Sequence, residues 1–294
     1  MDNSITAKYF RVTGEGTAPL FVNILTELFA LAIGDREIDI NPGQNNPLII
    51  RLERLDTSRS DFVTGELTRK QIIDIPAEAN DAGLQPVQLS QGGGLAYPSA
   101  FVYHRQSRVI LIQANPIAVS QGRLAHYLYN FNQLASYVFD PVLTTQAWAK
   151  FNRGPPRKIV IKLANPSQMI GLTGPANSVA ESAANLAEML EGPTVTIEVS
   201  MGQKHGSLAR NTVRRIVTSL MGRSFSEVET LSVSVKPDGE QTEVIDFLHE
   251  FLAYKDVLDL PENDHEQSYQ IRSGALRHDF ASNIAHINSL YGAQ

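Results

Sequence analysis

The segment GLAYPSAFVYHRQSRVILIQ, residues 94–113, decides how the middle of the chain folds. Two runs of apolar and β-branched residues flank the polar tetrapeptide Arg105-Gln106-Ser107-Arg108. Such runs, separated by a short polar turn, are typical of a β-hairpin. The segment therefore predicts an antiparallel hairpin with two arginines at its tip, which suggests a negatively charged partner.

The hairpin lies in a basic segment of an acidic chain. The net charge of the 294 residues is −6, yet residues 82–226 contain 13 basic and 5 acidic residues. Residues 1–81 contain 8 basic and 13 acidic residues, and residues 227–294 contain 4 and 13. Such an asymmetry is typical of chains that bind a polyanion. The alternative is that the acidic ends neutralise the basic middle within one fold.

Short elements precede the hairpin. The patterns predict strands over residues 8–13 and 48–55 and an apolar helix over residues 21–32. Residues 76–94 are expected to form a loop around a short helix. The glycines of residues 92–94 favour a hinge or turn over a phosphate cradle, because no helix start follows them.

A helix is predicted after the hairpin, over residues 123–138, where apolar residues recur with helical spacing. Ser120 is the expected N-cap of this helix. Tyr127, Tyr129 and Tyr137 fall in or near it. We expect these aromatic side chains to belong to the core, although stacking on nucleic-acid bases is the alternative.

The run Asn152-Arg153-Gly154-Pro155-Pro156 predicts a stiff domain boundary, because two consecutive prolines cannot lie inside a helix. We therefore expect an α+β fold with two domains. Residues 1–150 form a mixed α/β domain that contains the antiparallel hairpin, and residues 151–294 form a smaller domain of βαβαβα type. The second domain has predicted strands over residues 158–163, 194–200 and 230–236, and predicted helices over residues 177–190, 207–221, 242–254 and 282–291.

The predicted helix over residues 207–221 has two unlike faces. Its apolar arc contains Val213, Val217 and Leu220, and its opposite arc contains Arg210, Arg214 and Arg215, together with polar residues. No acid occurs between Val199 and Ser226, so the arginines have no carboxylate nearby in sequence. We interpret this face as a binding surface for a polyanion; a merely solvated face is the alternative.

All 13 basic residues of the middle segment are candidate contacts to phosphate groups. They are Arg105, Arg108, Arg123, Lys150, Arg153, Arg157, Lys158, Lys162, Lys204, Arg210, Arg214, Arg215 and Arg223. Eight of them are expected to line a positive cleft between the two domains: Arg105, Arg108, Arg157, Lys158, Lys162, Arg210, Arg214 and Arg215.

Motifs for catalysis are lacking. The chain contains no cysteine, which excludes disulfides and cysteine-based metal sites. It has no Gly-x-Ser-x-Gly, P-loop or His-Glu-x-x-His motif. We therefore expect neither an enzyme nor a bound metal or cofactor. No apolar run is long enough to span a bilayer and no signal-peptide pattern is visible, so a cytoplasmic protein without membrane insertion is expected.

Several short motifs, spread over about residues 5 to 165, resemble the RexA family, the DNA-sensing component of the Rex abortive-infection system of lambdoid phages and their prophage relatives. The segments that carry the resemblance are Ala7-Lys8-Tyr9, residues 94–101, Leu124 to Leu128, Phe139-Asp140-Pro141-Val142-Leu143 and the basic strand from Arg157 to Leu163. The resemblance implies a dimeric protein of two α/β domains that binds duplex DNA without strong sequence preference and signals to a membrane protein. The C-terminal third departs from it, being more acidic than expected.

Three functions remain open from the sequence. The first is a non-sequence-specific binder of double-stranded DNA, acting as a homodimeric sensor in phage exclusion. The second is a metal-dependent nuclease or another enzyme that acts on nucleic acid. The third is a protein-interaction subunit whose basic and acidic thirds pair between protomers.

Overall fold

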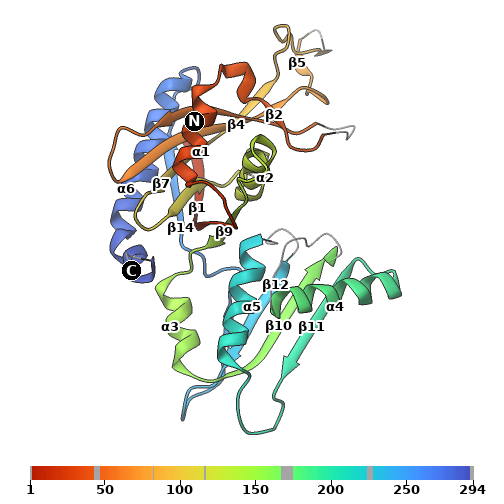
Figure 1. Ribbon diagram of the computed structural model, residues 1–294. Helices are drawn as coiled ribbons and strands as arrows, with labels where there is room; N and C mark the ends of the chain where they lie inside the picture. The colour runs from red at the N-terminus through yellow and green to blue at the C-terminus, as the bar shows by residue number, and fades with distance from the viewer. Residues whose placement is uncertain are drawn as a thin grey trace. The chain divides into compact units, whose positions relative to one another are not determined.

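The computed structural model describes residues 2–42, 47–81, 83–115, 117–166, 175–223 and 228–291 (Figure 1). The chain divides into two compact units. The first comprises Met1–Lys8, Val12–Tyr137 and Ala253–Gln294, and the second comprises Tyr9–Arg11 and Val138–Leu252. Helices and antiparallel sheets occur in both units, which confirms the predicted α+β class.

The larger sheet has eight strands in the order β14-β1-β8-β7-β4-β3-β2, with β9 paired to β1. The pairs β14–β1, β8–β7, β7–β4, β4–β3 and β3–β2 are antiparallel. The strands are β1 (Asp2–Gly14), β2 (Ile38–Asp39), β3 (Ile49–Asp56), β4 (Phe62–Gln71), β7 (Leu95–His104), β8 (Val109–Gln113), β9 (Tyr137–Pro141) and β14 (Ala253–Asp259). Two further short strands, β5 (Glu78–Asn80) and β6 (Gly83–Gln85), pair where a loop with a short helix was expected.

The predicted hairpin is confirmed. Strand β7 pairs with β8 so that Tyr103 lies opposite Ile110 and His104 lies opposite Val109. The tip is closed by the buried side chains of His104 and Ser107, whose Nδ1 and Oγ atoms lie 2.8 Å apart. Arg108 ends the turn with φ of 56°, in the left-handed region. The two arginines of the tip therefore flank a turn that is closed by side-chain hydrogen bonding.

Successive residues of β7 point to opposite faces of the sheet, and a different helix covers each face. On one face, the Tyr103 ring lies 4.9 Å from the ring of Phe21 in α1 (Phe21–Ala30). On the other face, the His104 ring lies 5.7 Å from the ring of Phe280 in α6 (His265–Tyr291). Figure 1 shows α6 running along the sheet on the side away from α1 and α2. A short 3₁₀ helix, η1 (Ile33–Arg36), follows α1.

Helix α2 (Gln121–Phe131) is shorter than the helix predicted over residues 123–138. Ser120 caps its start as expected, since its Oγ accepts a hydrogen bond from the Arg123 backbone N–H at 3.3 Å. Its end is set by the turn after Phe131, in which the Ala135 N–H donates to the Asn132 carbonyl at 2.7 Å. The prediction that the tyrosines belong to the core is confirmed for Tyr127 and Tyr137, whereas Tyr129 is 47% exposed.

The second unit contains a four-stranded antiparallel sheet in the order β11-β10-β12-β13. Its strands are β10 (Pro156–Ala164), β11 (Thr194–Ser200), β12 (Val228–Val235) and β13 (Glu243–Asp246), and its helices are α3 (Thr145–Arg153), α4 (Pro175–Leu190) and α5 (Arg210–Arg223). Along β10, three buried side chains alternate with half-buried ones. The buried side chains are those of Ile159, Ile161 and Leu163. The helices pack on the face that these three residues form.

The helix predicted over residues 242–254 is wrong, because this stretch forms β13, a turn and the start of β14. Burial alternates along it: Ile245 and Phe247 are 1% and 0% exposed, and Val244 is 63% exposed. An alternation of period two belongs to a strand. The βαβαβα pattern therefore ends in a strand instead of a helix.

The C-terminal segment belongs to the first unit, which differs from the predicted domain of residues 151–294. Strand β14 pairs with β1, so that Lys255 lies opposite Thr6. Helix α6 then covers 27 residues, far more than the predicted residues 282–291. The sequence pattern does not predict its full length, because three of its seven buried side chains, Ser268, Arg272 and Ser273, are polar.

Gly154 does not form a linker. It ends α3 in extended conformation, and a Cβ atom there would lie 2.5 Å from the Pro237 nitrogen and 2.6 Å from the Lys236 carbonyl carbon. Backbone atoms cannot yield as a flexible side chain can.

Replacing Gly154 with alanine should therefore destabilise the protein by about 1–3 kcal/mol, measured by urea unfolding. Gly192→Ala is the matched control, since nothing lies within 4 Å of its Cβ position; equal effects of the two substitutions would contradict the expectation.

Candidate nucleic-acid interface

Four of the 13 candidate cations form ion pairs with acidic residues of the second unit. Three of the four acids, Glu229, Glu240 and Glu250, belong to the acidic C-terminal third, residues 227–294. To this extent the structure follows the alternative in which acidic residues neutralise the basic middle. The pairs are Lys150–Glu250 at 2.8 Å, Arg153–Glu240 at 2.6 Å, Lys158–Glu198 at 3.4 Å and Lys162–Glu229 at 2.6 Å.

Three further arginines donate hydrogen bonds to backbone carbonyl groups. The Arg157 guanidinium donates to the carbonyl of Lys204 at 2.6 Å, to that of Gly202 at 3.2 Å and to that of Gly206. These hydrogen bonds fix the position of the loop that precedes α5. Arg210 donates to the carbonyl of Gly154 at 2.9 Å. Their guanidinium donors are thus partly used within the fold.

Arg123, in the first unit, is the third of these arginines. Its guanidinium donates to the Ala118 carbonyl. Burial lowers the pKa of Arg123, and the charge of Arg69 lowers it further. A cation held in this way is less free to meet a phosphate than an exposed one.

The sheet of the second unit separates Lys158 and Lys162 from the helix arginines. Both lysines alternate along β10 with the buried Ile159 and Ile161, so they lie on the face opposite the helices. Arg214 and Arg215 are carried by α5, on the helical side. These two groups of cations are therefore not brought together on one surface of this unit.

Helix α5 has the two faces that its sequence predicts. Val213, Val217 and Leu220 are 4%, 0% and 0% exposed and pack into the core. Arg214 and Arg215 are exposed on the other side. Lys204, in the loop before the helix, is exposed as well. Among the described residues, no carboxylate lies within 4.0 Å of these three side chains, which we call the α5 cations.

The single tryptophan of the chain lies beside the α5 cations. The Arg214 guanidinium carbon is 4.5 Å from the centre of the Trp148 ring. Trp148 in turn contacts Phe151 and Phe247 of the core, with ring centres 5.6 and 5.7 Å apart. A cation placed over an indole ring is attracted by the ring's quadrupole, so Arg214 is held in position while its N–H groups stay available.

The remaining candidates lie elsewhere. Arg105 and Arg108 are at the hairpin tip in the first unit, and they line a cavity with α1. Arg223 is the last residue of α5, and its side chain lies outside the described residues. The sequence therefore locates the α5 cations and the hairpin arginines, but it does not show that seven of the other candidates have partners inside the fold.

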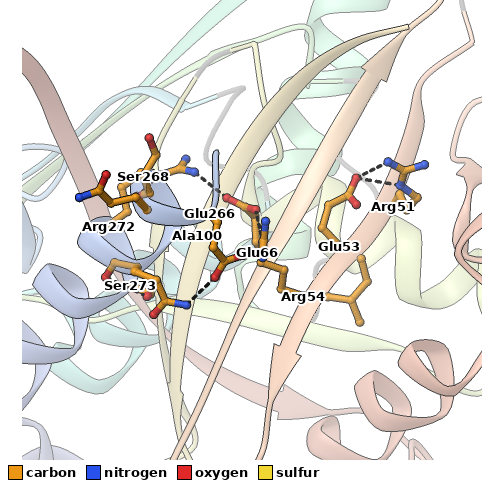
Figure 2. Close-up of polar contacts among 12 residues, drawn as sticks. Arg51, Glu53, Arg54, Glu66, Ala100, Glu266, Ser268, Arg272 and Ser273 are labelled. Atoms are coloured by element: carbon orange, nitrogen blue, oxygen red, sulfur yellow. Dashed lines mark hydrogen bonds and ion pairs between the residues drawn. The ribbon is translucent and has the colours of Figure 1, made fainter. Parts of the chain in front are cut away.

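The first unit contains a charged network that the sequence does not reveal. Figure 2 shows Arg272 of α6 and Arg54 of β3 reaching Glu66 on β4 from two sides. Arg272 Nη2 lies 2.6 Å from Glu66 Oε1, and the two side chains are 8% and 7% exposed, respectively. Arg54 Nε lies 3.2 Å from Glu66 Oε2 and also pairs with Glu266 at the start of α6. Burial raises the pKa of Glu66, and the two arginine charges act against this rise.

The network holds α6 against the polar part of the sheet. Ala100, opposite Glu66 on β7, is small and leaves space for the Arg272 side chain. The Arg54 guanidinium carbon also lies 5.0 Å from the centre of the Tyr269 ring. Since the partners come from sequence positions about 200 residues apart, no local pattern indicates them. We assign this network to the packing of α6 and not to binding.

Within the described ranges, no group of three or more histidine, aspartate or glutamate side chains is placed to hold a metal ion. Within the same ranges, no helix combines the length and the apolar character needed to cross a membrane.

The fold and the site define an α+β protein whose exposed α5 cations have no carboxylate partner within the described part of the chain. Residues 39–280 match a family of unknown function, DUF6731, and the chain belongs to this family. No curated protein matches the chain.

Proposed function

We propose that the protein binds DNA through its phosphates, without sequence preference, at the α5 cations Lys204, Arg214 and Arg215. The observation that carries the proposal is that these exposed side chains have no carboxylate partner among the described residues, although the chain as a whole is acidic. Four other cations of the basic middle segment, by contrast, are paired with carboxylates in the second unit. Cations left unpaired on one helix face are suited to an external polyanion.

The types of side chain favour contact with phosphates over readout of bases. Guanidinium groups present several N–H donors in a fixed plane and bind phosphate oxygens in a bidentate manner. Contacts of this kind position a duplex and carry no sequence information. Asn211 is an exposed amide side chain on α5, close to these arginines. One amide can recognise at most one base, so it would confer little sequence specificity.

The resemblance to the RexA family supports a more specific form of this proposal. In this form the two compact units are separate domains, and the protein acts as a homodimer in the cytoplasm. It senses DNA for a phage-exclusion system and passes a signal to a membrane protein. Dimerisation would double the number of α5 cations offered to one duplex, which suits a weak, phosphate-directed contact.

Salt dependence tests the proposal. We expect a fluorescein-labelled duplex of about 20 base pairs to bind with an affinity that falls steeply with salt, by a slope of about −2 to −3 in log K against log salt per protomer. Two duplexes of unrelated sequence should bind equally. If the α5 cations instead pair with acidic residues of a second protomer, salt will dissociate the oligomer and DNA will not bind at low salt; that result would overturn the proposal.

A further inference from the structure

A cavity of about 330 Å³ opens beneath the hairpin tip in the first unit. Its wall contains both tip arginines, Arg105 and Arg108, the aromatic side chains of Tyr103 and Tyr137, and the start of α1. This volume lies at the lower end of the range typical of small-molecule sites. The cavity is therefore large enough for a ligand of mononucleotide size.

The two arginines supply the cavity with unpaired positive charge. Among the described residues, neither has a carboxylate within 4.0 Å. Arg105 uses one guanidinium nitrogen to donate to the Thr57 carbonyl at 3.1 Å, while its Nε is buried without a hydrogen-bond partner. A buried N–H of a cation without an acceptor is costly. Because Nε is inaccessible, an anion in the cavity would be bound by the terminal nitrogens of the guanidinium groups.

The backbone holds Arg108 in an unfavourable conformation. Its φ of 56° lies in the left-handed region, which residues other than glycine, asparagine and aspartate rarely adopt. Its carbonyl accepts a hydrogen bond from the Val12 N–H at 2.7 Å, which fixes the end of the turn. An arginine at a position better suited to asparagine or glycine suggests that its side chain is required there.

The rest of the wall is mainly apolar and contains two tyrosines. Burial raises the pKa of Tyr103 and of Tyr137 to about 12 in both cases, so both hydroxyls stay protonated near neutral pH. The charges of Arg108 and Arg105 oppose this rise for Tyr103. The Tyr137 hydroxyl donates to the Pro19 carbonyl at 2.7 Å. A planar or apolar group can pack against these rings.

The start of α1 adds backbone donors to the cavity. Leu20 is the N-cap and provides no side-chain hydrogen bond, and the first turn contains no acidic residue. Phe21 and Val22 line the cavity at this point. Because the first N–H groups of a helix lack partners within it, they add to the positive potential that the arginines create.

We propose that this cavity binds a phosphate monoester of nucleotide size, with the phosphate between Arg105 and Arg108 and the base or sugar against the tyrosine-lined wall. The monoester is either a free mononucleotide or the terminal 5′-phosphate of a DNA strand. This site lies in the first unit and is distinct from the α5 cations.

Isothermal titration calorimetry with adenosine 5′-monophosphate and adenosine tests the site in the intact protein. We expect the monophosphate to bind at least about tenfold more tightly than adenosine, because two cations meet its charge. Its affinity should fall as the pH drops through about 6, where the phosphate gains a proton. In a protein whose α5 cations are substituted, tighter binding of a 5′-phosphorylated oligonucleotide than of the same oligonucleotide with a 5′-hydroxyl would assign the site to strand ends.

The variant Arg108→Asn removes the charge and suits the left-handed backbone, so the fold should be kept. We expect it to weaken binding of the monophosphate by about tenfold or more. The control Arg59→Asn changes an exposed arginine of the same unit and should leave binding unchanged. Measurable and equal binding of monophosphate and adenosine, an equal effect of both variants, or no binding of either phosphorylated probe at millimolar concentration would overturn the proposal. Substitution of the α5 cations should leave monophosphate binding intact.

Discussion

Replacing Arg272 with methionine is expected to lower the free energy of unfolding by about 3–5 kcal/mol. The substitution keeps much of the side-chain volume but leaves Glu66, which is 5% exposed, without its closest positive partner. Arg54 remains, although its contact is longer at 3.2 Å and its own side chain is 34% exposed. The loss is measured by urea unfolding at neutral pH, and the cost arises because a buried carboxylate is left largely uncompensated.

The effect should depend on pH in a definite direction. Burial holds the pKa of Glu66 above its ordinary value in the folded protein. A raised folded pKa contributes stability below the unfolded pKa, and this contribution is lost as the pH rises through the folded pKa. In the Arg272→Met variant the pKa should rise further, so the carboxyl protonates on acidification and the destabilisation shrinks as the pH falls below neutral.

Two further variants separate the ion pair from general effects on α6. The double variant Glu66→Gln/Arg272→Met removes both charges and should recover part of the lost stability, since no buried charge remains. Arg277→Met, further along α6, removes an arginine that takes no part in the network and should cost about 0.5 kcal/mol or less. A double variant less stable than Arg272→Met would show that the pair is not the cause.

The local parts of the fold were predictable from sequence. Residues 94–113 form the expected hairpin because alternation and turn chemistry act within 20 residues. The two faces of α5 were predictable for the same reason. The secondary structure of residues 242–254 was not predictable, because its apolar residues fit both a helical and a strand pattern. Pairing with neighbouring strands selects the strand.

Long-range partners could not be predicted. Lys150 and Glu250 are 100 residues apart in sequence, and Glu66 and Arg272 are 206 apart. A count of charges along the chain cannot show which cations such pairs occupy. The candidate site of 13 cations therefore divides into groups that only the fold reveals, and the exposed α5 cations are the part on which the binding hypothesis now depends.

Reversing two of the α5 cations, in the variant Arg214→Glu/Arg215→Glu, is expected to reduce affinity for duplex DNA by about 100-fold at low salt and to lessen the salt slope by about 2. Both side chains are exposed, so charge reversal leaves no buried group unpaired. Losing the contact between Arg214 and Trp148 should cost only about 0.5–1 kcal/mol of stability. Fluorescence polarisation of labelled DNA measures the affinity, and circular dichroism checks the fold.

The control is Lys158→Glu/Lys162→Glu, which changes the net charge by the same amount on the opposite face of the sheet. It sets the long-range effect of charge alone, so the helix variant must exceed it to implicate α5 directly. Trp148 provides an independent measure, because it is the single tryptophan and lies 4.5 Å from the Arg214 guanidinium carbon. DNA bound at α5 should alter Trp148 emission in the wild type and in the lysine variant. Equal loss of affinity in both variants, with unaltered emission on DNA addition, would remove α5 from the interface.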